Sequence, residues 1–326
     1  MSELVIDGLS FPEGPLWRDG RLLFSDFHAL RVQAVEADGS VTTVCEVEGQ
    51  PSGLGFDTDG RMLVVSMLDR RLLRLDLEGL TEVADLTALT GGPCNDMVVD
   101  RSGRAWVGEF GYDYGAPVRT AGIVRVDPDG AATRVADGVH FPNGFVMTPG
   151  GTLVVAETLG QRLTAFDVGE DGGLGPPRPW AAFAPGPAAG FPDAIASGAV
   201  TPDGICLDTE GAIWVADMAG GSAVRVVEGG EVTDVVPAGR GSPRSRWRSA
   251  ATTAARSSCA RARRSATATP GPSTAGSSSR RAWTPPACRT TGRRRRPGRV
   301  RPRPSPRSGR RPRPPRAGGP PPAAGA

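Results

Sequence analysis

Residues 141–147 read Phe-Pro-Asn-Gly-Phe-Val-Met, and variants of this stretch occur at four other places in the chain. They read Phe-Pro-Glu-Gly-Pro-Leu-Trp from residue 11, Gln-Pro-Ser-Gly-Leu-Gly-Phe from residue 50, Pro-Cys-Asn-Asp-Met-Val-Val from residue 93 and Thr-Pro-Asp-Gly-Ile-Cys-Leu from residue 201. Each copy puts one residue before a small or acidic turn residue and an apolar strand. These equivalent residues are Glu13, Ser52, Asn95, Asn143 and Asp203. Four of the five carry a carbonyl or carboxylate oxygen, so copies arranged around an axis would form an oxygen-lined metal site.

The spacing of the copies predicts the fold class. Successive motif positions are separated by 39, 43, 48 and 60 residues. A period near 40 residues with strand-like content is typical of four-stranded β-propeller blades. The second repeat shows strand patterns at 54–57, 61–67, 71–77 and 81–86, with an Asp-Gly turn after the first. Third strands are expected at 30–35, 122–126, 162–166 and 223–227, and loops at 111–120 and 169–198.

A second set of polar residues supports the same alignment. Fourteen residues after the motif position stand Ser66, Glu109, Glu157 and Asp217, and Asp26 stands 13 residues after Glu13. We interpret these residues as mainly structural, because carboxylates at strand ends bind neighbouring backbone N–H groups. Glu109 is in addition a candidate for substrate binding.

The pattern predicts an all-β propeller of the six-bladed type with five blades present. Residues 3–7 form a lone predicted strand, which implies a sixth blade beyond residue 237. Residues 241–326 instead contain no Leu, Ile, Phe, Met or Tyr and are dominated by Arg, Pro, Ser, Ala, Gly and Thr. Such a composition cannot bury enough apolar surface to offset chain entropy. We therefore expect a propeller domain over 1–240 and a disordered tail over 241–326.

Charge divides the chain at the same place. The first 240 residues hold 16 arginines and 35 acidic residues, a net charge of −19, whereas the tail holds 22 arginines and no acid. The tail could bind nucleic acid, for which arginine runs are weak evidence. The favoured interpretation is a gene read out of frame from about residue 240, so nucleic acid is not an expected partner of the propeller.

The remaining composition excludes several classes of protein. The five cysteines are scattered and show no Cys-x-x-Cys pair, so neither a disulfide framework nor a zinc cluster is indicated. The N-terminus does not read as a secretory signal, and no segment has the length of a membrane span. We expect a cytoplasmic protein without a membrane partner. The chain also lacks a Gly-x-Ser-x-Gly nucleophile motif and a phosphate-binding loop.

The motifs resemble those of the senescence marker protein / gluconolactonase (regucalcin-like) family of six-bladed propeller lactonases. The matching stretches begin at Phe11, Asn95, Phe141 and Pro202, and weaker matches lie at 24–26 and 213–217. The resemblance covers about residues 3–236. It implies one divalent cation, whether Ca, Zn, Mg or Mn, held by Glu13, Asn143 and Asp203, with Asn95 facing the substrate. Some relatives carry an Arg where this chain has Pro93, which puts an aldonolactone substrate in doubt.

The expected activity is hydrolysis of a small-molecule lactone or ester. Oxygen ligands that include two carboxylates suit a hard cation, which would polarise the lactone carbonyl and activate water. Asp203 is also the candidate catalytic base, and Asp96 is interpreted as structural. The alternatives are a non-catalytic propeller that serves as a binding scaffold and an inactive product of a frameshifted gene.

Overall fold

The computed structural model describes Ile6 and residues 8–237. These residues form five four-stranded antiparallel sheets, each with its strands in chain order. The predicted strand at 3–7, apart from Ile6, and the predicted disordered tail at 241–326 lie outside the described residues. Within the described residues, no helix has the length and apolar character needed to cross a bilayer.

The strand bounds follow the predicted repeats. Blade one consists of β1 (Pro12–Arg18), β2 (Arg21–Asp26), β3 (Arg31–Val35) and β4 (Val41–Glu46). Blade two consists of β5 (Pro51–Phe56), β6 (Met62–Ser66), β7 (Arg71–Asp76) and β8 (Gly79–Asp85). Blade three consists of β9 (Cys94–Val99), β10 (Ala105–Glu109), β11 (Ala121–Val126) and β12 (Ala132–Val139). Blade four consists of β13 (Pro142–Met147), β14 (Thr152–Glu157), β15 (Arg162–Asp167) and β16 (Arg178–Ala182), and blade five of β17 (Pro202–Leu207), β18 (Ile213–Asp217), β19 (Ser222–Val226) and β20 (Val232–Pro237).

One predicted loop was wrong in part. Residues 169–198 contain the outer strand β16 and the short helix α1 (Phe191–Ala196), where a continuous loop was expected. The many Gly and Pro residues of this segment hid both elements. β16 pairs with β15 despite Pro179, because an edge strand tolerates a residue that lacks an N–H group. Two single-turn 3₁₀ helices, Phe27–Ala29 and Thr87–Leu89, complete the regular elements of the described residues.

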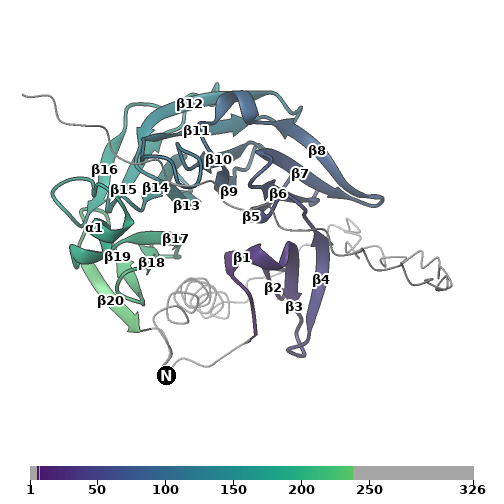
Figure 1. The fold of residues 1–326 in the computed structure, drawn as a ribbon, viewed down its shortest axis with the longest axis horizontal. Helices are drawn as coiled ribbons and strands as arrows, with labels where there is room; N and C mark the ends of the chain where they lie inside the picture. Colours follow the sequence, from purple (N-terminus) through teal and green to yellow (C-terminus); the bar gives the residue numbers. More distant parts are fainter. Residues whose placement is uncertain (1–5, 7, 238–326) are drawn as a thin grey trace, which may run out of the picture. The chain divides into compact units, whose positions relative to one another are not determined.

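The first strand of each blade is the innermost. Figure 1 shows β1, β5, β9, β13 and β17 on the inside and β4, β8, β12, β16 and β20 on the outside. Consecutive innermost strands also lie next to each other, in the order β1, β5, β9, β13 and β17. The motif copies therefore lie side by side, as the repeat pattern predicted.

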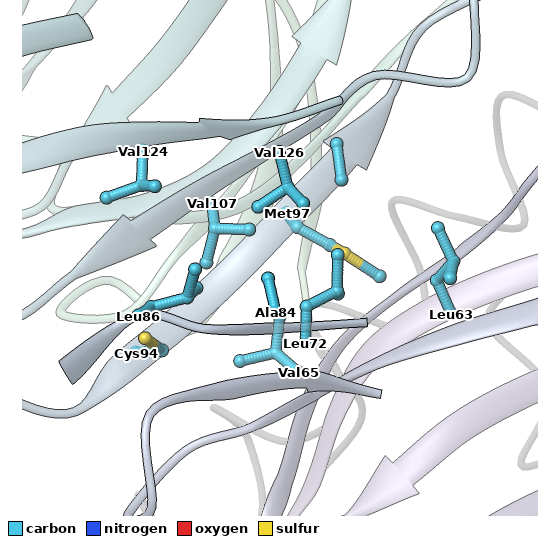
Figure 2. Close-up of a cluster of buried hydrophobic side chains, with 11 residues drawn as sticks. Leu63, Val65, Leu72, Ala84, Leu86, Cys94, Met97, Val107, Val124 and Val126 are labelled. Carbon is cyan, nitrogen blue, oxygen red and sulfur yellow. The ribbon is translucent and has the colours of Figure 1, made fainter. Parts of the chain in front are cut away.

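The hydrophobic core is divided into four layers, one between each pair of consecutive blades. The layer between blades two and three contains Leu63, Val65, Leu72 and Leu86 from one side and Met97, Val107 and Val124 from the other (Figure 2). The other three layers lie between blades one and two, three and four, and four and five. Because each blade is apolar on both faces, stacking is what buries it. Truncating a fully buried side chain such as Leu86 to alanine costs about 2–5 kcal/mol.

The outward faces of the first and last blades have much smaller clusters. Leu22, Phe24 and Val35 of blade one are covered by Ile6 and Leu9. On blade five, Trp214 and Ala223 pack with Cys206 and Val236, and Val235 on the outer strand is 58% exposed.

The innermost strands show the same contrast at a single glycine position. A Cβ atom at Gly144 would lie 2.4 Å from the backbone nitrogen of Ile205, so β13 and β17 touch at this point. The equivalent atom at Gly204 would meet no described residue within 4 Å. Gly204 of blade five would therefore permit a second innermost strand to pack against β17 on the side away from β13. The described residues provide no such strand.

Candidate functional site

All five motif residues occupy the same structural position. Each is the second residue of its blade's innermost strand, and we call them the inner set: Glu13, Ser52, Asn95, Asn143 and Asp203. Ser52, Asn95, Asn143 and Asp203 are buried, and Glu13 is partly buried. Because these strands lie side by side, the inner set gathers at the end of the propeller where the innermost strands begin.

A β-bulge accompanies every member of the inner set. In all five blades, three residue steps along the innermost strand match two steps along the second strand, as between Pro142 and Phe145 opposite Glu157 and Val155. A bulge bends its strand and re-aims the side chains beside it. The glycine that follows four of the five motif positions is therefore explained by the bulge as well as by a turn.

Two residues that precede the motif have a strained backbone. Gln50 and Phe141 have φ values of 68° and 57° and directly precede Pro51 and Pro142. This region is sparsely populated for side chains other than glycine and asparagine, and such strain persists only where the surroundings enforce it. It occurs here two residues before Ser52 and Asn143.

Carboxylates from three blades act on one another in this region. Burial raises the pKa of Glu13 well above its usual value, and the negative charges of Asp203 and Asp96 raise it further. Burial and the charge of Asp203 raise the pKa of Asp96 to about 7. Carboxylates that destabilise each other's charged forms in a desolvated place are a feature of functional sites. Asp96 occupies the position that is glycine in the other four copies, and its interpretation as structural missed this coupling.

Hydrogen bonds orient the two amide side chains. Asn143 Nδ2 donates to Thr158 Oγ1 at 3.3 Å, and Thr158 Oγ1 donates to the carbonyl oxygen of Pro202 at 2.7 Å. With its nitrogen held by Thr158, Asn143 presents Oδ1 as the atom available to a cation. Asn95 accepts from Ser52 Oγ at 3.3 Å and donates to the Pro142 carbonyl at 3.2 Å. Thr158 was missed in the sequence, although its place directly after Glu157 gave a signal.

The donor set fits a hard divalent cation. Glu13 and Asp203 supply carboxylate oxygens and Asn143 an amide oxygen, which are the ligand types of Ca²⁺, Mg²⁺ and Mn²⁺. Their mutual repulsion is the electrostatic situation that a cation relieves. Over the described residues there is no group of three or more His, Cys, Asp or Glu side chains of the kind that holds a metal ion. The set Glu13, Asn143 and Asp203 is of another kind, because one of its members is an amide.

The second set of polar residues lies at the same end but has different surroundings. We call it the outer set: each member ends its blade's second strand, namely Asp26, Ser66, Glu109, Glu157 and Asp217. Asp26 accepts from the N–H of Phe11 at 2.8 Å, Glu157 from that of His140 at 2.7 Å and Asp217 from that of Thr201 at 3.1 Å. Each bond fixes the segment that leads into an innermost strand, as expected for structural carboxylates.

Glu109 does not have the environment expected of a substrate-binding residue. It is fully buried, and its oxygens accept from the N–H groups of Gly91, Gly111 and Gly122 at 3.1, 2.6 and 2.7 Å. Arg134 adds an ion pair at 3.2 Å. These four donors, two in loops and two in the strands β11 and β12, engage both oxygens within its own blade, so we assign Glu109 to the outer set alone.

A cavity continues from the inner set along the innermost strands. Its volume is about 430 Å³, and its lining includes Asp96 together with Trp17, Phe56, Val99, Phe145 and Leu207. Apart from Asp96, these side chains are apolar or aromatic. Asp96, which directly follows Asn95 of the inner set, and Arg18 are therefore the charged residues of an otherwise mostly apolar lining.

Known proteins are similar to this chain in sequence and fold. Residues 11–243 match the family model described as the SMP-30/gluconolactonase/LRE-like region. The chain is 27% identical over 226 residues to regucalcin of Danio rerio, with 66% of this chain and 70% of that protein covered. It is 28% identical over 232 residues to 6-deoxy-6-sulfogluconolactonase of Pseudomonas putida, with 69% and 74% covered.

Solved structures agree with the fold. A gluconolactonase from Xanthomonas campestris superposes with a TM-score of 0.58 at 25% identity, over 72% of this chain and 78% of that chain. The family model alone spans more than half of the chain, and it begins at the first motif copy. From these matches and the five repeated blades, the chain belongs to the SMP-30/gluconolactonase/LRE-like family.

Proposed function

We propose that the chain is a metal-dependent lactonase, a carboxylic ester hydrolase that opens a small lactone to its hydroxy acid. The observation that carries this proposal is the gathering of Glu13, Asn143 and Asp203 from three blades, with Asp203 raising the pKa of Glu13. Two relatives whose names describe them as lactonases, the 6-deoxy-6-sulfogluconolactonase and the Xanthomonas gluconolactonase, support the reaction class.

Glu13, Asn143 and Asp203 would hold the cation through their oxygens. When bound, a divalent cation supplies a Lewis acid for the lactone carbonyl and for the oxyanion that forms on it. Three protein ligands leave room for water and substrate. Replacing the metal in turn by Ca²⁺, Mg²⁺, Mn²⁺ and Zn²⁺ would identify the cation that supports activity.

The chain's own residues supply positioning and proton transfer. Asp203 is the proposed general base, which accepts a proton from the attacking water as its oxygen bonds to the lactone carbon. The ring C–O bond then breaks, and the departing alkoxide takes up a proton to become the hydroxyl of the product. Asn95 is the proposed substrate-orienting residue, because Ser52 and Pro142 fix its amide beside the inner set.

A pH-stat assay with chelated and metal-restored protein tests the proposal. Lactone hydrolysis should disappear after chelation and return with at least one of the four cations. Failure to hydrolyse any lactone in the presence of all four would contradict the proposal and would favour a non-catalytic propeller.

A further inference from the structure

The end of the propeller that holds the inner set also carries an arc of aromatic side chains. We define this aromatic arc as six residues: Phe11, Phe27, Phe110, Tyr112, Phe141 and Phe191. Phe11 and Phe141 directly precede the innermost strands β1 and β13, and Phe27 and Phe110 directly follow the second strands β2 and β10. Innermost strands begin and second strands end at one end of the blades, so these residues lie at the same end as Glu13 and Asn143.

The members of the arc pack against one another as a layer. The rings of Phe110 and Phe141 stack with centroids 4.5 Å apart, and Phe191 meets Phe141 edge-on at 4.9 Å. Tyr112 lies 6.3 Å from Phe141, and Phe11 lies 5.3 Å from Phe27. All six rings belong to one apolar cluster.

The arc offers a partly open apolar surface. Phe27, Phe110 and Phe141 are buried, while Phe11, Tyr112 and Phe191 are partly exposed. The inner three rings thus support the outer three. Burial raises the pKa of the Tyr112 hydroxyl above its ordinary value, as expected for a tyrosine set among hydrocarbon.

Two polar side chains beside the arc, Arg70 and His140, already have partners. The Arg70 guanidinium pairs with Asp113 at 2.6 Å and reaches the Thr90 carbonyl at 3.4 Å. His140 Nδ1 lies 3.2 Å from a Glu157 oxygen. A polyhydroxylated lactone needs partners for each buried hydroxyl, because an unpaired buried hydroxyl is unfavourable. An aryl or alkyl group needs only apolar surface, and aromatic rings provide that in large amounts.

We propose that the lactone opened at the inner set carries an apolar substituent, aryl or alkyl, that packs on the aromatic arc. This inference rests on the proposed lactonase function and narrows its substrate class. Phe191 is the specificity-determining residue of choice for a test, because it is partly exposed and lies on the short helix α1 rather than in a blade.

Three lactones with the same five-membered ring test the inference: γ-phenyl-γ-butyrolactone, unsubstituted γ-butyrolactone and D-ribono-1,4-lactone. With metal-restored full-length protein, kcat/KM for the phenyl lactone should exceed that for the ribonolactone about tenfold or more, which corresponds to burying one ring. Phe191→Ala should lower this preference severalfold. Leu77→Ala is the matched control, since Leu77 is 74% exposed and follows β7 at the opposite end of blade two.

The outcomes separate the two proposals. Faster hydrolysis of the ribonolactone would overturn the inference and leave the lactonase function standing. An unchanged preference in folded Phe191→Ala protein would also overturn it. Absence of hydrolysis with all three lactones and all four cations would count against both.

Discussion

The inner and outer sets both contain carboxylates at the same end of the blades, yet the electrostatic environments of these carboxylates are opposite. Outer-set carboxylates are matched by donors: Glu157 binds Arg162 at 2.8 Å and also Thr164, and these partners hold its pKa below the usual value despite burial. In the inner set, burial and the negative charge of Asp203 instead raise the pKa of Glu13.

The difference separates structure from function more sharply than residue type does. A carboxylate that already has backbone N–H groups and arginines as partners stabilises a loop and has a structural role. Carboxylates forced together without enough positive charge destabilise the metal-free fold, and a cation offsets that destabilisation. Removing an inner-set carboxylate should therefore affect activity, and removing an outer-set carboxylate should affect stability.

The largest expected effect is on activity, in blade five, where each set has an aspartate. Asp203→Ala should reduce kcat/KM for lactone hydrolysis by about 10³-fold or more, because it removes both a proposed ligand and the proposed base. Asp217→Ala is the matched control and should lower the melting temperature while the folded protein stays active. Equal loss of activity in the two variants, both folded, would remove the distinction between the sets.

The next effect is on stability, in blade three. Glu109→Ala should lower the free energy of unfolding by about 3–5 kcal/mol, because it leaves Arg134 and three backbone N–H groups without their buried acceptor. Denaturant titration measures the change. Asn95→Ala, on the neighbouring strand, should reduce stability less than Glu109→Ala does and should reduce activity more. A near-neutral Glu109→Ala would show that this carboxylate is not structural.

The pH dependence of stability should report the crowding of charge in the inner set. Asp96 titrates near 7 when folded and near 3.8 in its ordinary state, so the folded protein binds more protons between these values. Metal-free stability should therefore fall as the pH rises from about 4 to 7, by about 1 kcal/mol per pH unit. Chemical unfolding at several pH values gives the slope, and Asp96→Asn should flatten it. If stability instead rises over this pH range in the wild type but not in Asp96→Asn, the pKa of Asp96 is lowered on folding and the assignment is wrong.

Adding a metal ion should raise the stability that the metal-free protein loses as the pH rises. A cation present at 100 times its dissociation constant should stabilise the chain by about 2.7 kcal/mol. The shift should be larger at pH 7 than at pH 5, because fewer protons then compete with the cation for the inner-set carboxylates. Thermal melts with and without cation measure it, and Glu13→Gln should abolish it. A shift of equal size in Glu13→Gln protein would place the cation elsewhere.

Much of the fold could be predicted from sequence because each blade repeats the same local pattern. The motif positions, the strand order and Asp26 or Asp217 at the strand ends all follow from alternation and spacing. The strand β16 could not be predicted, since Pro179 and the surrounding glycines mask an edge strand. The bulge was also missed, because a turn and a bulge favour the same small residues.

The site was harder to predict than the fold, because side-chain partners are not a sequence property. Glu109 and Glu13 look alike in the sequence, and only the backbone of residues 91, 111 and 122 reveals that Glu109 is already bound. Thr158, directly after β14, accepts a hydrogen bond from Asn143 on β13, and this contact cannot be read from the sequence. Asp96 breaks the glycine pattern of the motif, and its pKa is raised by burial and by the charge of Asp203, neither of which can be read from the sequence.

Isothermal titration of the metal-free chain with Ca²⁺, Mg²⁺, Mn²⁺ and Zn²⁺ tests the central claim most directly. One site per chain is predicted for at least one cation in the wild type, lost in Glu13→Gln and Asp203→Asn and retained in Glu157→Gln. Binding that survives both inner-set substitutions, or that is absent for all four cations in folded wild-type protein, would contradict the account.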